Sequence, residues 1–223
     1  MKRLFVIAFL FCLYALSASA QIKYCMTYTD FKEGNWVEVD DKLSMTESTR
    51  AQKIWLGKND VKIDVKNDSL EKLLKKEVFA ILYQENLLIN CRKIYYKENR
   101  FGKGYAFGYL YGKRILFVAQ DPSEDSRGAG AALSGGLAFG VVGGLVLGSL
   151  ASIEGMQKGY CFLVKHERRD GKIDVEMIDD TFMKKFEKKS PEFYDEYMSV
   201  KKKKKRESAA HVFHLFKDWQ LIQ

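Results

Sequence analysis

The chain has 223 residues and a mass of 25.7 kDa, which allows one or two domains. Its composition, 47% hydrophobic and 30% charged, is that of a globular protein and excludes a disordered, collagen-like or multi-span membrane protein. The formal net charge of +8 is spread along the chain, so neither half is a basic domain that binds nucleic acid. This balance leaves open only a weak attraction to anionic lipid headgroups.

Residues 1–20 have the pattern of a secretory signal peptide. Two basic residues precede an apolar run from Leu4 to Leu16, and alanines stand at the −3 and −1 positions of a cut after Ala20. The apolar run is too short for an ordinary membrane span, and an uncleaved anchor is the alternative. We therefore expect an exported mature chain from Gln21, located in the periplasm, in an envelope membrane or outside the cell.

Three cysteines remain after such a cut, Cys25, Cys91 and Cys161. An odd number in an oxidising compartment permits one disulfide and one free thiol. All three lie in apolar, strand-like stretches, which favours buried and unpaired cysteines that act as small hydrophobic residues. No C-x-x-C motif occurs, so thioredoxin-like chemistry is not supported.

Residues 21–120 predict a β-rich exported domain with a mainly antiparallel sheet. The alternation of apolar and charged side chains in Val61–Val65 is typical of a half-buried strand. One short helix is expected to cover a face of the sheet, with Asp68 as its N-cap and Glu71 completing a capping box. Two hairpins are predicted, joining residues 78–83 to 87–90 and residues 105–110 to 114–119.

Residues 128–153 form an apolar segment without a charged side chain and hold eight of the seventeen glycines. Four of these glycines, Gly136, Gly140, Gly144 and Gly148, are each four residues apart. In an α-helix this spacing makes one smooth stripe, against which a second helix can pack closely in lipid. A helix of this length, at about 1.5 Å per residue, is long enough for a hydrocarbon layer of about 30 Å.

The glycine-rich composition also keeps two other interpretations of residues 128–153 open. In water each interior glycine costs a helix up to about 1 kcal/mol relative to alanine, which disfavours a free soluble helix. The segment is therefore a glycine-zipper helix, which is transmembrane or associated with other helices in lipid, or else a folded helical hairpin or a flexible loop.

Residues 154–223 predict a β-hairpin followed by a helical tail. The hairpin joins residues 160–164 to 173–178, and Ser190-Pro191 has the pattern of a helix start. A last amphipathic helix is expected over residues 211–222. The predicted fold class is therefore α+β: a mainly antiparallel sheet with one short covering helix, the glycine-rich insert and C-terminal helices.

Smaller motifs carry little chemistry. Lys201–Arg206 is a run of six positive charges, interpreted as a solvated helix face or a frayed linker, with contact to an anionic surface as the alternative. His211 and His214 lack a third ligand at helical spacing for a metal. Gly102-Lys103-Gly104 is more typical of a turn than of a phosphate loop. We therefore predict no catalytic, cofactor-binding or metal-binding residue.

Several stretches resemble a family of uncharacterised exported proteins from Bacteroidetes, a domain of unknown function. They are Tyr28–Lys32, Lys75–Val78, Leu87–Arg92 and Ser190–Tyr197. The resemblance implies export and a β-rich fold but assigns no site residue. The glycine stripe is similar to glycine-zipper segments of bacterial envelope proteins, which implies membrane association.

The sequence favours a non-enzymatic cell-envelope protein that associates with membrane lipid, with partner helices or with itself through the glycine stripe. The alternative is a soluble periplasmic or secreted binding domain whose glycine-rich insert packs on itself or on a partner. Neither interpretation includes a cofactor or nucleic acid, and the ligand is unknown. An enzyme is the least favoured class, because no catalytic constellation stands out.

Overall fold

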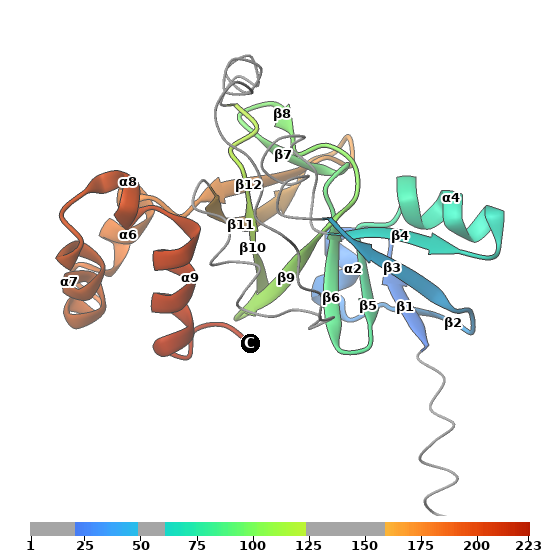
Figure 1. The fold of residues 1–223 in the computed structure, drawn as a ribbon, viewed down its shortest axis with the longest axis horizontal. Coiled ribbons are helices and arrows are strands. Elements are labelled where there is room, and N and C mark those ends of the chain that lie inside the picture. The colour runs from blue at the N-terminus through green and yellow to red at the C-terminus, as the bar shows by residue number, and fades with distance from the viewer. Residues whose placement is uncertain (1–20, 49–60, 124–158) are drawn as a thin grey trace, which may run out of the picture.

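The structure, a computed structural model, describes residues 21–48, 61–123 and 159–223 (Figure 1). The strands in chain order are β1 (Ile22–Cys25), β2 (Val37–Val39), β3 (Leu43–Glu47), β4 (Val61–Val65), β5 (Ala80–Tyr83), β6 (Asn86–Asn90), β7 (Ile94–Tyr96), β8 (Asn99–Arg100), β9 (Tyr105–Tyr111), β10 (Arg114–Ala119), β11 (Tyr160–Glu167) and β12 (Ile173–Met177). The helices are α2 (Tyr28–Glu33), α4 (Asp68–Lys76), α6 (Asp180–Met183), the 3₁₀ turn η3 (Lys184–Phe186), α7 (Pro191–Ser199), α8 (Lys203–Arg206) and α9 (Ala209–Asp218).

The twelve described strands belong to one sheet. Its main path is β2-β1-β5-β6-β9-β10-β11-β12-β7-β8, while β4 joins β3 to β9. Every pairing between these described strands is antiparallel except that of β12 with β7. This arrangement, with a few helices beside it, confirms the predicted mainly antiparallel α+β fold.

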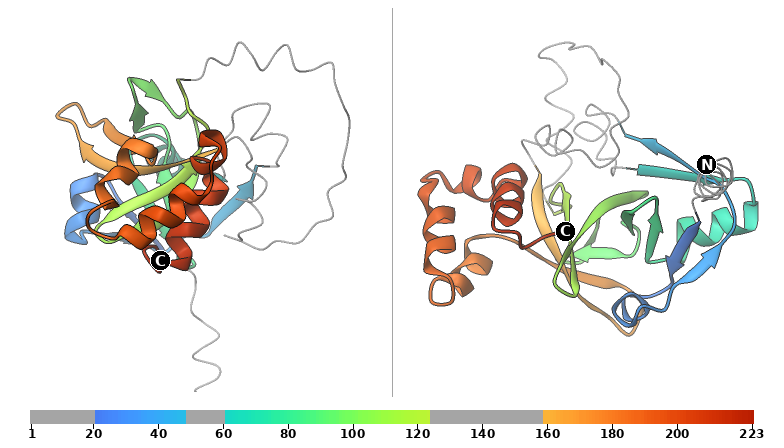
Figure 2. Two further views of the ribbon diagram at one scale, coloured as in Figure 1. Left: turned by 90° about the vertical axis from the view of Figure 1, so that its left-hand side faces the viewer. Right: turned by 90° about the horizontal axis from the view of Figure 1, so that it is seen from below.

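The sheet is strongly curved around a core. β7 begins only a few residues after β6 ends, yet it pairs with β12, four places from β6 along the sheet path. The sheet must therefore turn back on itself, as Figure 2 shows. The concave side encloses an aromatic cluster in which Phe101 and Phe117 both pack against Phe162, at centroid distances of 4.9 and 5.6 Å.

β10 and β11 are buried on both faces. Ile115 and Phe117 of β10 point into the concave core, while Leu116 and Val118 point to a second core under the C-terminal helices. Alternate residues of a strand face opposite sides, so both sets must be apolar. This explains the continuous apolar runs in these two strands.

The C-terminal helices, α6 to α9 with η3, lie together on one side of the sheet, and α4 lies on the opposite side (Figure 1). We call α6 to α9 together with η3 the helical unit. Phe193, Phe216 and Val212 are among the side chains that bury it against β10 and β11. After α9, the chain end returns to β9, where Leu110 and Gln223 exchange two backbone hydrogen bonds of 2.9 and 3.0 Å.

The predicted hairpins are confirmed. β5 and β6 join through Gln84-Glu85, which both have a positive φ, and β9 and β10 join through a turn in which Gly112 has φ +57°. Positive φ at both central residues is the two-residue hairpin geometry whose twist matches the strands. β11 and β12 form the third predicted hairpin.

Local details of the helices differ from the prediction. Asn67, not Asp68, caps α4, because its side chain accepts hydrogen bonds from the N–H groups of Ser69 and Leu70. The capping box found in the structure is that of α2, a helix that the strand-like sequence did not predict, where Thr27 and Asp30 bond reciprocally. α9 ends at Asp218 rather than at residue 222.

The predicted signal peptide and the glycine stripe, with Gly136, Gly140, Gly144 and Gly148, lie outside the described residues. The strands on either side of the glycine-rich segment are nevertheless neighbours, with Ala119 of β10 opposite Tyr160 of β11. Within the three described ranges, no helix is long and apolar enough to cross a membrane.

Candidate functional site

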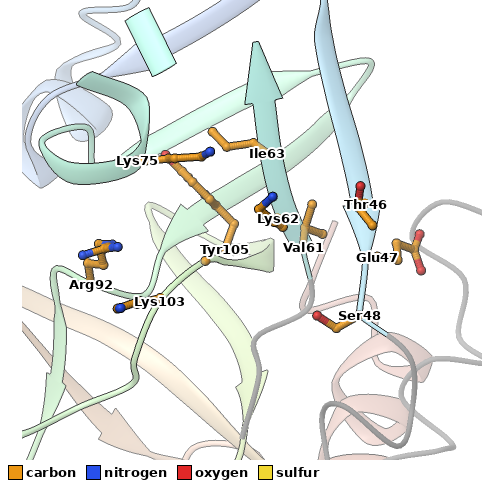
Figure 3. A pocket seen from close by; sticks show the side chains of 11 residues that line it. Thr46, Glu47, Ser48, Val61, Lys62, Ile63, Lys75, Arg92, Lys103 and Tyr105 are labelled. Atoms are coloured by element: carbon orange, nitrogen blue, oxygen red, sulfur yellow. The ribbon is translucent and has the colours of Figure 1, made fainter. Parts of the chain in front are cut away.

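A pocket of about 490 Å³ opens between the end of β3, the start of β4, the C-terminal half of α4 and the loop before β9 (Figure 3). Four of its lining side chains are cationic and one is acidic. The lining comprises Thr46, Glu47, Ser48, Val61, Lys62, Ile63, Lys75, Arg92, Lys103, Gly104 and Tyr105. We call it the cationic pocket.

The centre of the cationic pocket is apolar and rigid. β4 and β9 meet there through the pairing of Val61 with Tyr105, and both residues are about 1% exposed. The Tyr105 hydroxyl donates a hydrogen bond to the carbonyl of Leu74 in α4. Burial raises the pKa of Tyr105 well above its ordinary value, against a smaller opposing effect of Arg92. The phenol therefore stays neutral, and its role is to hold β9 against α4 through this hydrogen bond.

Asn90 positions two of the four cations. Its side chain is fully buried, and its amide nitrogen donates to the carbonyls of Leu74, Lys75 and Val78 at 3.3, 3.4 and 2.9 Å. The last carbonyls of a helix have no partner within the helix, so this amide completes the end of α4. Its oxygen accepts from the backbone N–H of Arg92 at 3.1 Å. One side chain thus fixes both the helix end that carries Lys75 and the turn that carries Arg92.

The loop that carries Lys103 is tied to the same turn. The carbonyl of Gly104 accepts a hydrogen bond of 3.0 Å from the N–H of Cys91. Gly102 and Gly104 have φ values of +97° and +99°, a region that favours glycine. Figure 3 shows Arg92 and Lys103 next to each other at one side of the pocket. The predicted turn at Gly102-Lys103-Gly104 is therefore present and brings a cation to the site.

The charges of the other two cations, Lys62 and Lys75, are balanced by nearby carboxylates. Asp64 lies 3.0 Å from the ammonium of Lys75 and 3.3 Å from that of Lys62, and Lys75 also pairs with Glu71. Burial lowers the pKa of Lys75, but the two carboxylates outweigh it and the pKa is raised. The hydrogen bond from Lys75 holds the pKa of Asp64 below its ordinary value, against the opposing effect of burial. Lys62 and Lys75 thus form a closed ion-pair group at one wall.

Arg92 differs from these two lysines. Within the described part of the chain its guanidinium makes no ion pair, while its backbone N–H bonds to Asn90. A half-buried guanidinium offers planar, paired donors that match carboxylate, phosphate or sulfonate oxygens. The pocket can therefore hold the anionic group of a ligand at Arg92 and its apolar part against Val61, Ile63 and Tyr105.

Residues 23–223 match a family of unknown function, DUF6563. The chain belongs to this family. No curated protein and no solved structure matches the chain.

The three predicted cysteines do not belong to the pocket lining. Cys25, Cys91 and Cys161 are buried, and they form no disulfide with one another. The thiols of Cys25 and Cys161 point at the carbonyls of Ala80 and Ala209, 3.9 and 3.7 Å away. Burial raises the pKa of Cys25 to about 12, although the Ala80 carbonyl and nearby Lys93 act in the opposite direction. Such a thiol is a poor nucleophile.

The two helical histidines are not brought together with other ligands. Among the described residues, no group of three histidine, cysteine or acidic side chains could hold a metal ion. His211 stacks on the ring of Tyr197 at a centroid distance of 5.9 Å, and its Nε2 atom is buried with no hydrogen-bond partner in the described chain. His211 is thus part of the packing of the helical unit.

Sequence reasoning missed the pocket. One signal was available: Asn90 is a polar residue at the end of an apolar strand, where a buried amide must find partners. Nothing local marked Arg92, Lys62 or Lys75, since each stands in an ordinary amphipathic context. They meet only through the long-range contact of β4 with β9.

Proposed function

We propose that the protein is a non-enzymatic, exported binding protein of the cell envelope, and that the cationic pocket takes a small anionic ligand with an apolar body. The observation that carries the proposal is Arg92, a half-buried guanidinium without an ion-pair partner among the described residues, at a pocket whose lining holds four cations and one acid. Its volume of about 490 Å³ falls in the range of small-molecule sites, about 300–1,000 Å³.

The division of charges in the pocket indicates where the anion binds. Lys62 and Lys75 already share Asp64, so a ligand gains little by displacing that carboxylate. Arg92 has no such competitor and is held in place through Asn90. A pre-positioned cation loses little side-chain freedom on binding, which favours affinity. The apolar wall then selects anions that carry a ring or an alkyl part over free inorganic anions.

A fluorescent probe with the same two features tests the proposal. The probe 8-anilinonaphthalene-1-sulfonate joins a sulfonate to apolar rings, and N-phenyl-1-naphthylamine has the rings without the charge. We expect saturable binding of the sulfonate by the folded protein and at least about 10-fold weaker binding after Arg92→Gln, because a charge-assisted contact is worth roughly 1.5–3 kcal/mol. The neutral probe should bind both proteins alike.

Arg169→Gln is the matched control, since Arg169 is an exposed arginine on the turn between β11 and β12. It removes the same charge from the protein but no group from the pocket lining. Equal affinity of the Arg92→Gln and Arg169→Gln proteins for the sulfonate would contradict binding in the cationic pocket. A circular-dichroism melt of each variant confirms that the compared proteins are folded.

The glycine spacing favours a second candidate function, association with lipid or with another helix through residues 128–153. Because the flanking strands β10 and β11 pair, we propose that the segment enters lipid only in a form that returns to the same side. Gly140→Leu with Gly144→Leu should weaken self-association in detergent without preventing membrane insertion, because leucine fills the groove but raises hydrophobicity. Val141→Leu with Val146→Leu is the control. Recovery of the unmodified protein as a monomer insensitive to lipid would reject this candidate.

A further inference from the structure

Five consecutive lysines, Lys201–Lys205, are exposed at the connection between α7 and α9. We call this segment the lysine turn. It runs from the residues just after α7 into the short helix α8, at the edge of the helical unit (Figure 1). The sixth basic residue of the run, Arg206, is only 8% exposed and points inward. The run therefore contains two different kinds of cation.

Arg206 fastens the lysine turn to the helical unit. Its guanidinium contacts both carboxylate oxygens of Asp180 at 2.8 and 2.6 Å. The same group donates to the carbonyls of Val200 and Lys201 at 2.9 and 3.4 Å. The Tyr197 hydroxyl also donates to Asp180, at 2.8 Å. The start of the lysine turn is thus held by a buried network, so the frayed-linker interpretation of this run is wrong.

The far end of the lysine turn is fixed as well. The Ser208 hydroxyl donates to the carbonyl of Lys205 at 2.7 Å, and the Glu207 carboxylate accepts from the backbone N–H of Asp180 at 3.1 Å. Glu207 also lies 3.7 Å from the ammonium of Lys203. The other four lysines of the turn make no ion pair within the described chain, so their charges face solvent without compensation.

We propose that the lysine turn is a docking surface for an anionic phospholipid bilayer. Successive residues of an α-helix are about 100° apart around its axis, so the lysines of α8 diverge and do not converge on one point. A divergent set of charges suits an extended charged plane better than a single bound anion. Because the backbone of the turn is already fixed, binding orders only the lysine side chains.

The residue types favour lipid over nucleic acid. The turn has no aromatic side chain for base stacking, and its one arginine is buried against Asp180. Lysine is a compact point charge without the planar fork that reads base edges or fixed phosphates. Each lysine near an anionic bilayer strengthens binding about fivefold, and this attraction is screened by salt.

Sedimentation with vesicles tests the proposal. Purified protein is mixed with vesicles of phosphatidylcholine alone or with 30% phosphatidylglycerol, at about 50 mM and 500 mM salt. We expect stronger binding to the anionic vesicles, lost at the higher salt. Replacing Lys201, Lys202, Lys204 and Lys205 by glutamine should lower the partition onto anionic vesicles about 100-fold or more. Lys203 is kept because it faces Glu207.

The matched control replaces four other exposed lysines by glutamine, Lys66, Lys72, Lys76 and Lys113. Its net charge equals that of the quadruple variant of the lysine turn. It should lower the partition by less than about fivefold, because those lysines lie away from the turn. An equal loss in both quadruple variants would overturn the proposal. So would equal binding to neutral and anionic vesicles, as insertion of an apolar segment alone would give. Lysine-dependent binding of duplex DNA without binding to vesicles would show that the lysine turn binds nucleic acid, and it would also overturn the proposal.

Discussion

The sheet and the helical unit each bury a polar side chain that donates hydrogen bonds to backbone carbonyls near the end of a helix, Asn90 in the sheet and Arg206 in the helical unit. Asn90 donates to three carbonyls at the C-terminal end of α4. Arg206 donates to two carbonyls just beyond α7. Asn90 satisfies carbonyls that a helix leaves without a partner at its end, and Arg206 satisfies carbonyls of the chain just after a helix. In each region, the chain beyond that helix end carries the cations of a proposed binding surface.

The difference between the two regions is charge. Asn90 is neutral and fully buried, and it needs no counter-ion. Arg206 brings a charge inward and is accompanied by Asp180, whose pKa it holds below the ordinary value, mainly through their hydrogen bonds and against the effect of burial. An amide can be buried wherever hydrogen bonds suffice, whereas a guanidinium requires a carboxylate. The helical unit should therefore be the more sensitive region to loss of one side chain.

Arg206→Ala is expected to give the largest effect. It leaves the Asp180 carboxylate without its cation and two carbonyls without their donor, and removal of one partner of a buried ion pair typically costs about 3–5 kcal/mol. Because the Asp180 side chain is 33% exposed, we expect the lower end, about 3 kcal/mol of unfolding free energy. Urea denaturation followed by circular dichroism measures this loss.

Two further variants separate the ion pair from the hydrogen bonds. Tyr197→Phe removes one hydrogen bond to Asp180 and should cost about 1 kcal/mol. Adding Asp180→Ala to Arg206→Ala should destabilise less than the sum of the single changes, since no carboxylate is then left unpaired. Strict additivity of Arg206→Ala and Asp180→Ala would show that the two side chains are not energetically coupled. It would contradict the claim that the helical unit differs from the sheet by depending on a charged pair.

Asn90→Ala is expected to give a smaller but clear loss, about 2 kcal/mol, because the carbonyls of Leu74 and Val78 lose a donor in a buried site. It should also weaken sulfonate-probe binding, since Arg92 loses its anchor. Thermal unfolding and the fluorescence titration measure the two effects. Asn99→Ala, at an exposed asparagine of β8, serves as control and should change neither by more than about 0.5 kcal/mol.

The sequence predicted those parts of the fold that depend on neighbouring residues. The hairpins of β5–β6, β9–β10 and β11–β12 follow from apolar runs separated by turn residues, and all three are present. α2 was not predicted, because six residues with only one buried side chain show no apolar stripe. The parallel pairing of β12 with β7 depends on the whole sheet closing on itself, and no local pattern contains that information.

The candidate sites were predicted less well than the fold, for a physical reason. The lysine turn was visible as a charge run, but Arg206 within it looks like its neighbours, and only its contact with Asp180, 26 residues away, makes it structural. The cationic pocket was invisible, because its cations come from β4, α4 and two loops. Composition shows which charges a chain carries, and topology decides which of them meet.

The smallest effect we predict is a pH dependence confined to the helical unit. Burial lowers the pKa of His211 below its ordinary value of 6.5, and nearby Arg206 acts in the same direction, against the opposing effects of the Tyr197 backbone and Glu196. The unfolded chain therefore takes up a proton near pH 6.5, before the folded chain does. Stability from the neutral ring is complete above that pH and is lost as the pH falls toward the folded-state pKa.

His211→Gln should remove this dependence, so that urea midpoints at pH 7.5 and pH 5.5 differ less in the variant than in the parent protein. His166→Gln, at an exposed histidine of β11, should keep the parent difference. The Asp180 carboxyl does not contribute in this window, because its lowered pKa makes its effect appear only below about pH 4. If the parent midpoint were the same at both pH values, or if His166→Gln abolished the difference, the buried ring of His211 would not be the titrating group. A loss that follows His211 alone would show that the helical unit, which already buries a charged pair, also excludes a second cation beside Arg206.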